Sequence, residues 1–394
     1  MRTSPIQTLL LLLVAPVLIG LQARADVDVQ LTGVPDYPWV YGCFGTGSGN
    51  LMGYWDRHGF PDFYTGPTAG GVAPLRNNST NVGIRSLWAS QAGFDGRPTG
   101  AHGHVNDYYV DYEFTGTDPY ITANRAEHAA DCIGDFIGLN QKRWTNMNNE
   151  CDGNIDGYAF VFWDTNGTKR VNFIPPPQGT NAVKDIPSGL RAWTRYRGYE
   201  ADSFSQLVSF NPKCPAGQGF TFEDVKAEID AGYPLLTFLQ GYTANSRALS
   251  GMPKANPSIH AMLIYGYLIY GGVTNVYVRD GYGGGEEYRN WSTISWLSGG
   301  SYPVRGVIGY HPKPRMRSIN ISGADVTISW DGPSSELYDD LTGTTWPVHF
   351  YQLEKSAALD PADFQPVGPP TTVRTLTIPD CCGAAGYYRV RLLP

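Results

Sequence analysis

Short, largely apolar segments bounded by turn residues predict strands along much of the chain. Residues 26–34 are typical of an N-terminal strand, and IDGYAFVFWD (155–164) has the pattern of a strand between two turns. LLTFLQG (235–241), the segment from His260 to Tyr267 and VTNVYVRD (273–280) follow, the last two as a hairpin. WSTISW and VRGVIGYHP complete what we expect to be an antiparallel sheet.

Two segments have the period of a helix. In FTFEDVKAEIDAGYPLL, Thr221 is a candidate N-cap, Val225 and Ile229 share one face, and Gly232 marks the end. The segment RAEHAADCIGDFIG predicts a short amphipathic helix from the spacing of its apolar residues Ala126, Ala129, Ile133 and Phe136.

A third helix is expected near Cys43, where the extended segment VPDYPWVYGC meets LMGYWDRHGF. A helix N-terminus has unpaired N–H groups and a partial positive charge, which favour a thiolate. Gly45, Gly47 and Gly49 would each cost about 1 kcal/mol relative to Ala inside a helix. We therefore expect the helix to begin late, with weaker support for the thiolate.

The last part of the chain predicts a separate module. PKPRMRS suggests a linker at 312–316, and VTISW, HFYQLEKS, VRTLTIP and YYRVRLL alternate as half-buried strands do. Residues 317–394 thus resemble a small β-sandwich of fibronectin type III size, to which we assign no catalysis. Residues 26–311 would form the main domain.

Residues 1–25 have the features of an export signal. Arg2 is followed by an apolar run from Leu9 to Leu21 and by the small-x-small site Ala23-Arg24-Ala25. We expect cleavage after Ala25 and a secreted or periplasmic protein. Nothing later in the chain predicts a membrane span.

Charge and composition narrow the classes of function. Without residues 1–25 the chain carries 27 basic and 36 acidic residues, a net charge of −9. This argues against nucleic acid as a partner, because duplex binding needs clustered Lys and Arg. Abundant Gly, Pro, Tyr and Trp favour a loop-rich fold with strands, and we expect a monomer.

Cys43, His260 and Asp280 follow one another in the order of a thiol hydrolase. A thiol nucleophile needs a base within hydrogen-bond reach and a third group that orients the base. His260 opens a strand and Asp280 ends the next one, so the two can lie side by side on adjacent strands. Cys43 would be the nucleophile, His260 the general base and Asp280 the orienting acid.

Several motifs carry a family resemblance over residues 30–310. The chain resembles the exported, C39-like branch of the cysteine peptidase family that includes bacteriocin leader peptidases. The matching segments, in order, are VPDYPWVYGC, GYWD, HGHVNDYY, EHAADCIGDFIG, GNIDG, FTFEDVKAEIDAGYP, His260 and Asp280. The resemblance implies a papain-like α+β domain with a helix packed on an antiparallel sheet, a peptide or protein substrate, and no metal or organic cofactor.

The same resemblance points to Tyr37 as an oxyanion donor. It lies six residues before Cys43, where papain has a glutamine, and its phenol could act beside the Cys43 backbone N–H. Tyr37 is equally well explained as a core aromatic residue. Two other functions stay open: a non-catalytic exported binding protein with the same fold, and a transglutaminase-like acyltransferase. The substrate and the cleavage preference are not set by the sequence.

The remaining cysteines and polar clusters leave alternatives. Cys381 and Cys382 could form a vicinal disulfide, and one bridge could form among Cys132, Cys151 and Cys214. His102, His104 and Asp107 in HGHVNDYY, together with His128, are candidate metal ligands. A turn near the cleft explains HGHVNDYY better than a metal site does. DGNIDG begins like a calcium loop through Asp152, Asn154 and Asp156, but its twelfth position is Trp163 and not Glu.

Overall fold

The computed structural model describes most of the chain after residue 25. The described residues are 26–39, 42–65, 71–78, 82–88, 130, 132–138, 159–177, 183–240, 258–292, 294–295, 301–379 and 386–393. The expected signal peptide, the HGHVNDYY and GNIDG motifs, and Cys151, Cys381 and Cys382 lie outside this part.

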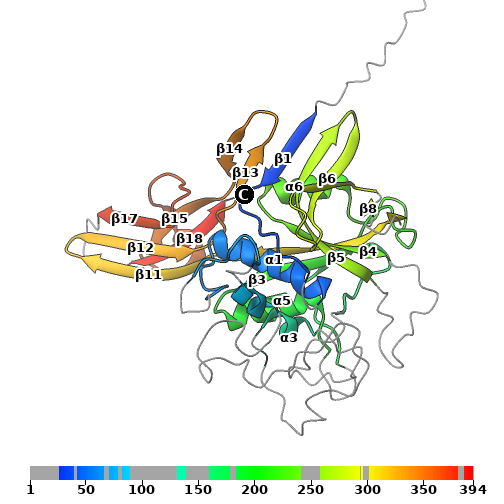
Figure 1. The fold of residues 1–394 in the computed structure, drawn as a ribbon. Coiled ribbons are helices and arrows are strands. Elements are labelled where there is room, and N and C mark those ends of the chain that lie inside the picture. The colour runs from blue at the N-terminus through cyan, green and yellow to red at the C-terminus, as the bar shows by residue number, and fades with distance from the viewer. Residues whose placement is uncertain are drawn as a thin grey trace, which may run out of the picture.

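An antiparallel sheet forms the centre of the molecule (Figure 1). Its strand order is β14-β13-β1-β5-β4-β10-β3-β2, and β6 and β7 extend it from β5. The strands of this sheet are β1 (Val27–Leu31), β2 (Arg170–Val171), β3 (Ala201–Leu207), β4 (Leu235–Gln240), β5 (Ser258–Tyr270), β6 (Val273–Arg279), β7 (Glu287–Asn290), β10 (Val304–Pro312), β13 (Glu336–Asp339) and β14 (Thr344–Pro347). A separate small hairpin pairs β8 (Ile294–Ser295) with β9 (Ser301–Tyr302). The expectation of an antiparallel sheet built from β4, β5, β6 and β10 is confirmed, whereas the placement of WSTISW in that sheet is wrong, because among the described residues its strand β8 pairs only with β9.

Four helices occur in the described residues. They are α1 (Cys43–Arg57), α3 (Ile133–Ile137), α5 (Ile186–Tyr196) and α6 (Phe222–Asp230), with short 3-10 turns at η1 (Val82–Leu87) and η3 (Pro361–Asp363). Thr221 caps α6 as expected, since its hydroxyl accepts from the Asp224 amide at 3.2 Å, and Val225 and Ile229 are fully buried. Helix α5 is not predicted from the sequence, although Asp185 caps it and Pro187 stands in its first turn.

The prediction of a papain-like α+β domain is wrong. Strands make up 39% of the structure and helices 19%, and the strands are mostly antiparallel. Helix α1 does contact β4 and β5, but a single sheet of ten strands organises the fold. The prediction overestimated the helical part of the fold because it relied on a few local motifs. The pairing of distant strands leaves no local signal in the sequence.

Residues 159–164 contain no strand, although the sequence predicts one there. Their side chains still alternate: Phe160 and Phe162 pack in a small cluster with Val183, whereas Val161 and Trp163 join the main core. The alternating pattern therefore reflects an extended, two-sided buried segment without a ladder of hydrogen bonds.

Two further three-stranded sheets form a β-sandwich in the last part of the chain (left in Figure 1). One contains β11 (Arg315–Ser322), β12 (Asp325–Asp331) and β17 (Thr375–Pro379), and the other β15 (Phe350–Ser356), β16 (Gln365–Pro366) and β18 (Tyr387–Leu393). They share a core centred on Val326, Ile328, Trp330, Tyr351 and Leu353. The predicted β-sandwich is thus present.

The segment between β12 and β15 leaves the sandwich and joins the main sheet. Strand β13 pairs antiparallel with β1, so that Val29 lies opposite Asp339 and Leu31 opposite Leu337. Only Lys313 and Pro314 separate β10 from β11, where a linker over 312–316 is expected. The part of the chain after β10 therefore contributes strands to the main sheet and also forms the sandwich beside it.

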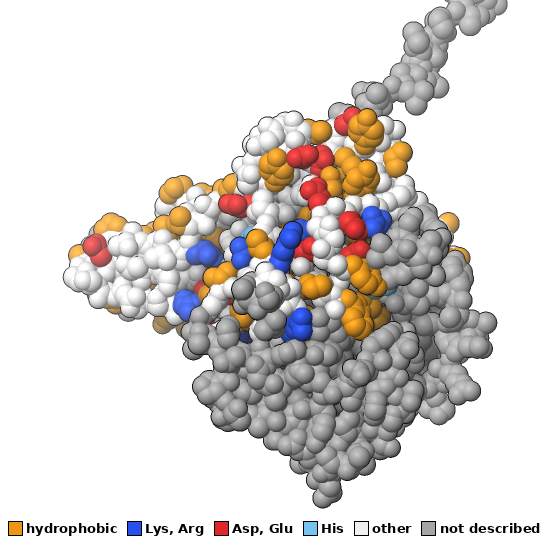
Figure 2. Space-filling view, in the orientation of Figure 1, with side chains coloured by type: hydrophobic (Ala, Val, Ile, Leu, Met, Phe, Trp, Pro, Cys, Tyr) orange, Lys and Arg blue, Asp and Glu red, His pale blue; other side chains and the backbone are white. Residues whose placement is uncertain are grey.

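Hydrophobic side chains gather with acidic ones at one end of the sheet, over the β13–β14 and β5–β6 hairpins (upper part of Figure 2). The exposed apolar side chains in these two hairpins are Leu341, Trp346, Tyr270 and Val273. They lie near the outer end of β1, which pairs with both β5 and β13.

Candidate thiol site

Cys43 is the first residue of α1, so the helix does not begin late. Gly42 precedes it with φ 110°, a conformation that favours glycine, and its carbonyl accepts from the Thr46 amide at 3.0 Å and the Thr46 hydroxyl at 2.9 Å. The first turn is thereby closed directly after an extended segment. The expectation of a thiol at a helix N-terminus is confirmed.

Glycines in α1 allow its close packing, which offsets their low helix propensity. A Cβ on Gly49 would lie 2.5 Å from Trp88 Cε3, and a Cβ on Gly53 would lie 2.6 Å from the Tyr37 hydroxyl. Gly47 faces the sheet, with its virtual Cβ 3.4 Å from Leu236 Cδ2. The glycine run is therefore a packing feature of a regular helix.

The Cys43 sulfur lies at the peptide bond between His260 and Ala261. The backbone amides of Ala261, Cys43 and Phe44 act as hydrogen-bond donors to this sulfur and favour its thiolate form. Burial has the larger and opposite effect, and it raises the pKa of the Cys43 thiol to about 11. The side chain is half-buried by its exposed area, and at neutral pH it carries a neutral thiol.

His260 lies in β5 and is 3% exposed. Its Nε2 donates to the backbone oxygen of Asp280 at 2.8 Å; a carbonyl can only accept, so Nε2 carries the proton. Burial lowers the pKa of His260 to about 4, because the cation loses its solvation. A neutral ring with its proton on Nε2 has its basic lone pair on Nδ1.

Asp280 is brought to His260, but through its backbone carbonyl and not through its carboxylate. Its Oδ1 accepts from the Tyr282 amide at 2.8 Å, and its carboxylate also forms a hydrogen bond with the Glu287 carboxyl group. The expected contact of His260 with the Asp280 carboxylate is therefore absent, and the neutral Asp280 carbonyl orients the ring instead.

Tyr37 occupies the core, the second of the two roles considered for it. It is fully buried, its hydroxyl donates to the Pro74 carbonyl at 2.6 Å, and its ring stacks on Trp88 with centroids 5.4 Å apart. The Tyr37 backbone amide donates to Asn50 Oδ1 at 2.9 Å. The hydrogen bond to Asn50 ties Tyr37 to α1. Because its single hydroxyl proton is donated to the Pro74 carbonyl, Tyr37 is not available as an oxyanion donor. The Cys43 backbone N–H remains the donor to consider.

Two residues of the site were not singled out in the sequence. The Tyr282 ring stacks on the His260 ring with centroids 5.8 Å apart and an interplanar angle of 16°, and it is 46% exposed. Glu287 reaches Asp280 from β7. Both occur in GYGGGEEY, directly after Asp280. Two acidic residues at the end of a glycine-rich turn are the sequence signal that could have identified this part of the site.

The other candidate groups fall mostly outside the described residues. His102, His104, Asp107, His128 and the Asp152–Asp156 loop lie there, so the structure does not bear on them. Within the described part, no three His, Cys, Asp or Glu side chains gather as a metal site would require. Cys214 carries a free thiol, as does Cys43.

Comparisons with known proteins give no assignment. No family model, curated protein or solved structure matches this chain. In the described part, no helix combines the length and the apolar character that crossing a membrane requires.

Proposed function

We propose that this chain is an exported thiol hydrolase that cleaves peptide bonds, with Cys43 as nucleophile and His260 as general base. The observation that carries the proposal is the sulfur at the N-terminus of α1, against the peptide bond that joins His260 to Ala261. The motif resemblance to exported C39-like cysteine peptidases supports a peptide or protein substrate, and the signal-like residues 1–25 support export to the periplasm or the medium.

The protonation states favour a mechanism that starts from a neutral pair. Both Cys43 and His260 are uncharged at neutral pH, so the proton moves from sulfur to Nδ1 as the sulfur attacks the carbonyl carbon. The Asp280 carbonyl holds the opposite side of the ring through Nε2. The imidazolium then gives its proton to the leaving amine, and water hydrolyses the thioester.

Backbone amides are the donors available to the oxyanion. The amides of Cys43 and Phe44 lie in the first turn of α1, where they have no carbonyl partner within the helix and point at the reacting sulfur. We assign the oxyanion contact to the Cys43 amide, which leaves Tyr37 with a packing role only.

A non-catalytic binding protein is the second candidate, and one observation favours it. Burial holds Cys43 and His260 in the forms in which neither is charged, so the thiol is not activated before a ligand arrives. A chain of this kind would retain peptide ligands without cleaving them.

Substitution of the nucleophile separates the two candidates. A fluorogenic peptide library is incubated with the wild type, Cys43→Ala and His260→Ala, and Cys214→Ala serves as the matched control because it removes a free thiol elsewhere. We expect Cys43→Ala to lose hydrolysis by at least about 10³-fold and His260→Ala by about 10²- to 10⁴-fold, with Cys214→Ala unchanged. Hydrolysis that survives Cys43→Ala excludes the hydrolase. Peptide binding by the wild type without hydrolysis favours the binding protein.

A further inference from the structure

We propose that Glu287 is a positioning residue for His260, acting through a carboxyl pair with Asp280 that fixes the glycine-rich turn 280–285. The inference rests on the proposed function, because it concerns the base of that reaction. Glu287 then controls the orientation of His260, and this control depends on a proton shared between Glu287 and Asp280.

The turn after Asp280 has little to hold it in place by itself. Gly281, Gly283 and Gly285 all have positive φ, between 70° and 92°, and glycine has no side chain that could pack. Its start is set by the hydrogen bond from the Tyr282 amide to Asp280 Oδ1. The carbonyl that orients His260 belongs to Asp280 itself, so any rotation of this residue moves the acceptor of Nε2.

Two contacts anchor the far end of the turn. The Gly285 amide donates to Asp36 Oδ2 at 3.2 Å, and Arg279 Nη1 donates to the Gly285 carbonyl at 2.5 Å. Glu287 follows at the start of β7 and folds back, since its Oε1 lies 2.8 Å from the position of a Cβ on Gly284. Glu287 therefore closes the turn by binding the residue with which the turn begins.

The groups around Glu287 favour its protonated form. Burial, the Asp280 carboxylate, the hydrogen bond to that carboxylate and the Asp36 carboxylate all raise the pKa of Glu287, whereas its ion pair with Arg289 lowers it. The net direction is upward. Two carboxyl groups in contact share one proton more stably than they hold two charges.

The raised pKa of Glu287 determines the direction in which hydrolysis changes with pH. At low pH Glu287 holds its proton and donates to Asp280, so the turn is closed. As the pH rises through the raised pKa of Glu287, the proton is lost, two carboxylates face each other, and Asp280 turns away from His260. We therefore expect hydrolysis to fall on the alkaline side of its pH profile.

The test compares Glu287→Gln, Glu287→Ala and Glu286→Gln. Gln keeps a donor to Asp280 at every pH, Ala removes it, and the exposed Glu286, whose carboxylate contacts Gln30, is the matched control. The measurements are the pH profile of kcat/KM on the best peptide from the library and the ¹H–¹⁵N NMR signal of the His260 Nε2–H in histidine-labelled protein.

In Glu287→Gln we expect the alkaline limb to disappear, while Glu286→Gln keeps it. Below the alkaline limb of the wild type, Glu287→Ala should lose about tenfold in kcat, the rate equivalent of one hydrogen bond, with little change in KM. Above that limb the wild type has lost the same hydrogen bond, so the difference between the two should disappear. Arg289→Gln should move the limb to higher pH, because the cation that opposes protonation is gone.

Two results would overturn the inference: an alkaline limb that persists in Glu287→Gln, or a His260 signal that Glu287→Ala leaves unchanged. If the wild type shows no Cys43-dependent hydrolysis, the proposed function fails instead, and the NMR signal alone decides whether Glu287 positions His260.

Discussion

Burial acts on Cys43 and His260 in the same direction, toward the uncharged form of each side chain. The pKa of the thiol rises to about 11 although three backbone amides donate to the sulfur, and that of the imidazole falls to about 4 although the Asp280 carbonyl accepts from it. Desolvation therefore outweighs the local hydrogen bonds at both residues. A preformed thiolate–imidazolium pair is not the resting state.

This balance sets the expected pH dependence of the chemistry. Hydrolysis should fall as the pH drops through about 4, because protonated His260 cannot accept the proton of Cys43.

Alkylation of Cys43 by iodoacetamide should rise tenfold per pH unit from pH 6 to 10, since the thiolate fraction follows a pKa of about 11. Peptide mapping separates Cys43 from Cys214. Fast alkylation that is constant between pH 5 and 8 contradicts the neutral pair and indicates an ion pair.

At the scale of elements, the packing of α1 decides where the nucleophile lies. One side of the helix approaches Leu236 and Ala261 of the sheet through Gly47, and another accommodates Trp88 through Gly49. Close contact on both sides leaves the start of the helix, and with it the Cys43 sulfur, little freedom to shift. Glycines that cost helix propensity therefore fix the position of the site.

Two alanine substitutions in α1 test this packing. Gly49→Ala should lower the free energy of unfolding by about 1–3 kcal/mol, because the new methyl group would clash with the Trp88 ring at 2.5 Å. Gly47→Ala should leave it unchanged or raise it by about 1 kcal/mol, since its Cβ meets Leu236 at an ordinary 3.4 Å and Ala is the better helix former. Urea unfolding followed by circular dichroism measures both. Equal effects of the two substitutions would mean that the Trp88 contact does not constrain α1.

The sequence predicts the individual elements of this molecule better than their assembly. Apolar runs between turn residues located β4, β5, β6 and β10, because these strands are buried along most of their length. The pairing of β13 with β1 joins residues about 300 positions apart, which no local pattern reveals. The site shows the same limit. Cys43, His260 and Asp280 stand at element boundaries that the sequence indicates, whereas the use of the Asp280 carbonyl depends on the backbone geometry of a turn.

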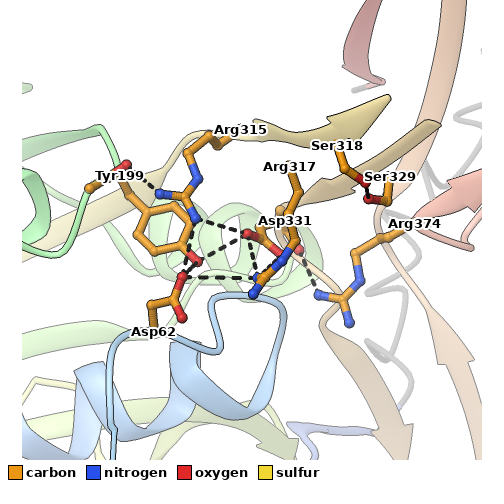
Figure 3. A network of polar contacts seen from close by, with 10 residues as sticks. Asp62, Tyr199, Arg315, Arg317, Ser318, Ser329, Asp331 and Arg374 are labelled. Carbon is orange, nitrogen blue, oxygen red and sulfur yellow. Dashed lines mark hydrogen bonds and ion pairs between the residues drawn. The ribbon is translucent and has the colours of Figure 1, made fainter. Parts of the chain in front are cut away.

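At the scale of the whole molecule, a polar network joins the loops after α1 and α5 to the sandwich (Figure 3). Asp331, at the end of β12, accepts from Arg317 at 3.0 Å, from Arg315 at 3.2 Å and from the Tyr199 hydroxyl at 3.1 Å. Arg315 and Tyr199 also contact Asp62, which follows α1. A second contact of the same kind runs from the Tyr54 hydroxyl of α1 to Ser335 Oγ at 2.6 Å. The helix that carries the nucleophile is thus tied to both parts of the chain.

The network predicts that the two parts unfold together and that Asp331 is needed for their docking. Asp331→Ala should lower the free energy of unfolding by about 1–3 kcal/mol, because a carboxylate that is only 7% exposed and pairs with Arg315 and Arg317 is removed. The loss is limited because both arginines keep Asp62 as a partner and, at 35% and 46% exposed, are screened by solvent. Asp325→Ala, at the exposed start of the same strand, should change stability by less than about 0.5 kcal/mol. Urea unfolding monitored by tryptophan fluorescence and by circular dichroism should give coincident transitions in the wild type, because buried tryptophans lie both in the sandwich (Trp330) and in the main core (Trp55). Separate transitions in the wild type, or equal losses in the two variants, would show that the sandwich is held by something other than this network.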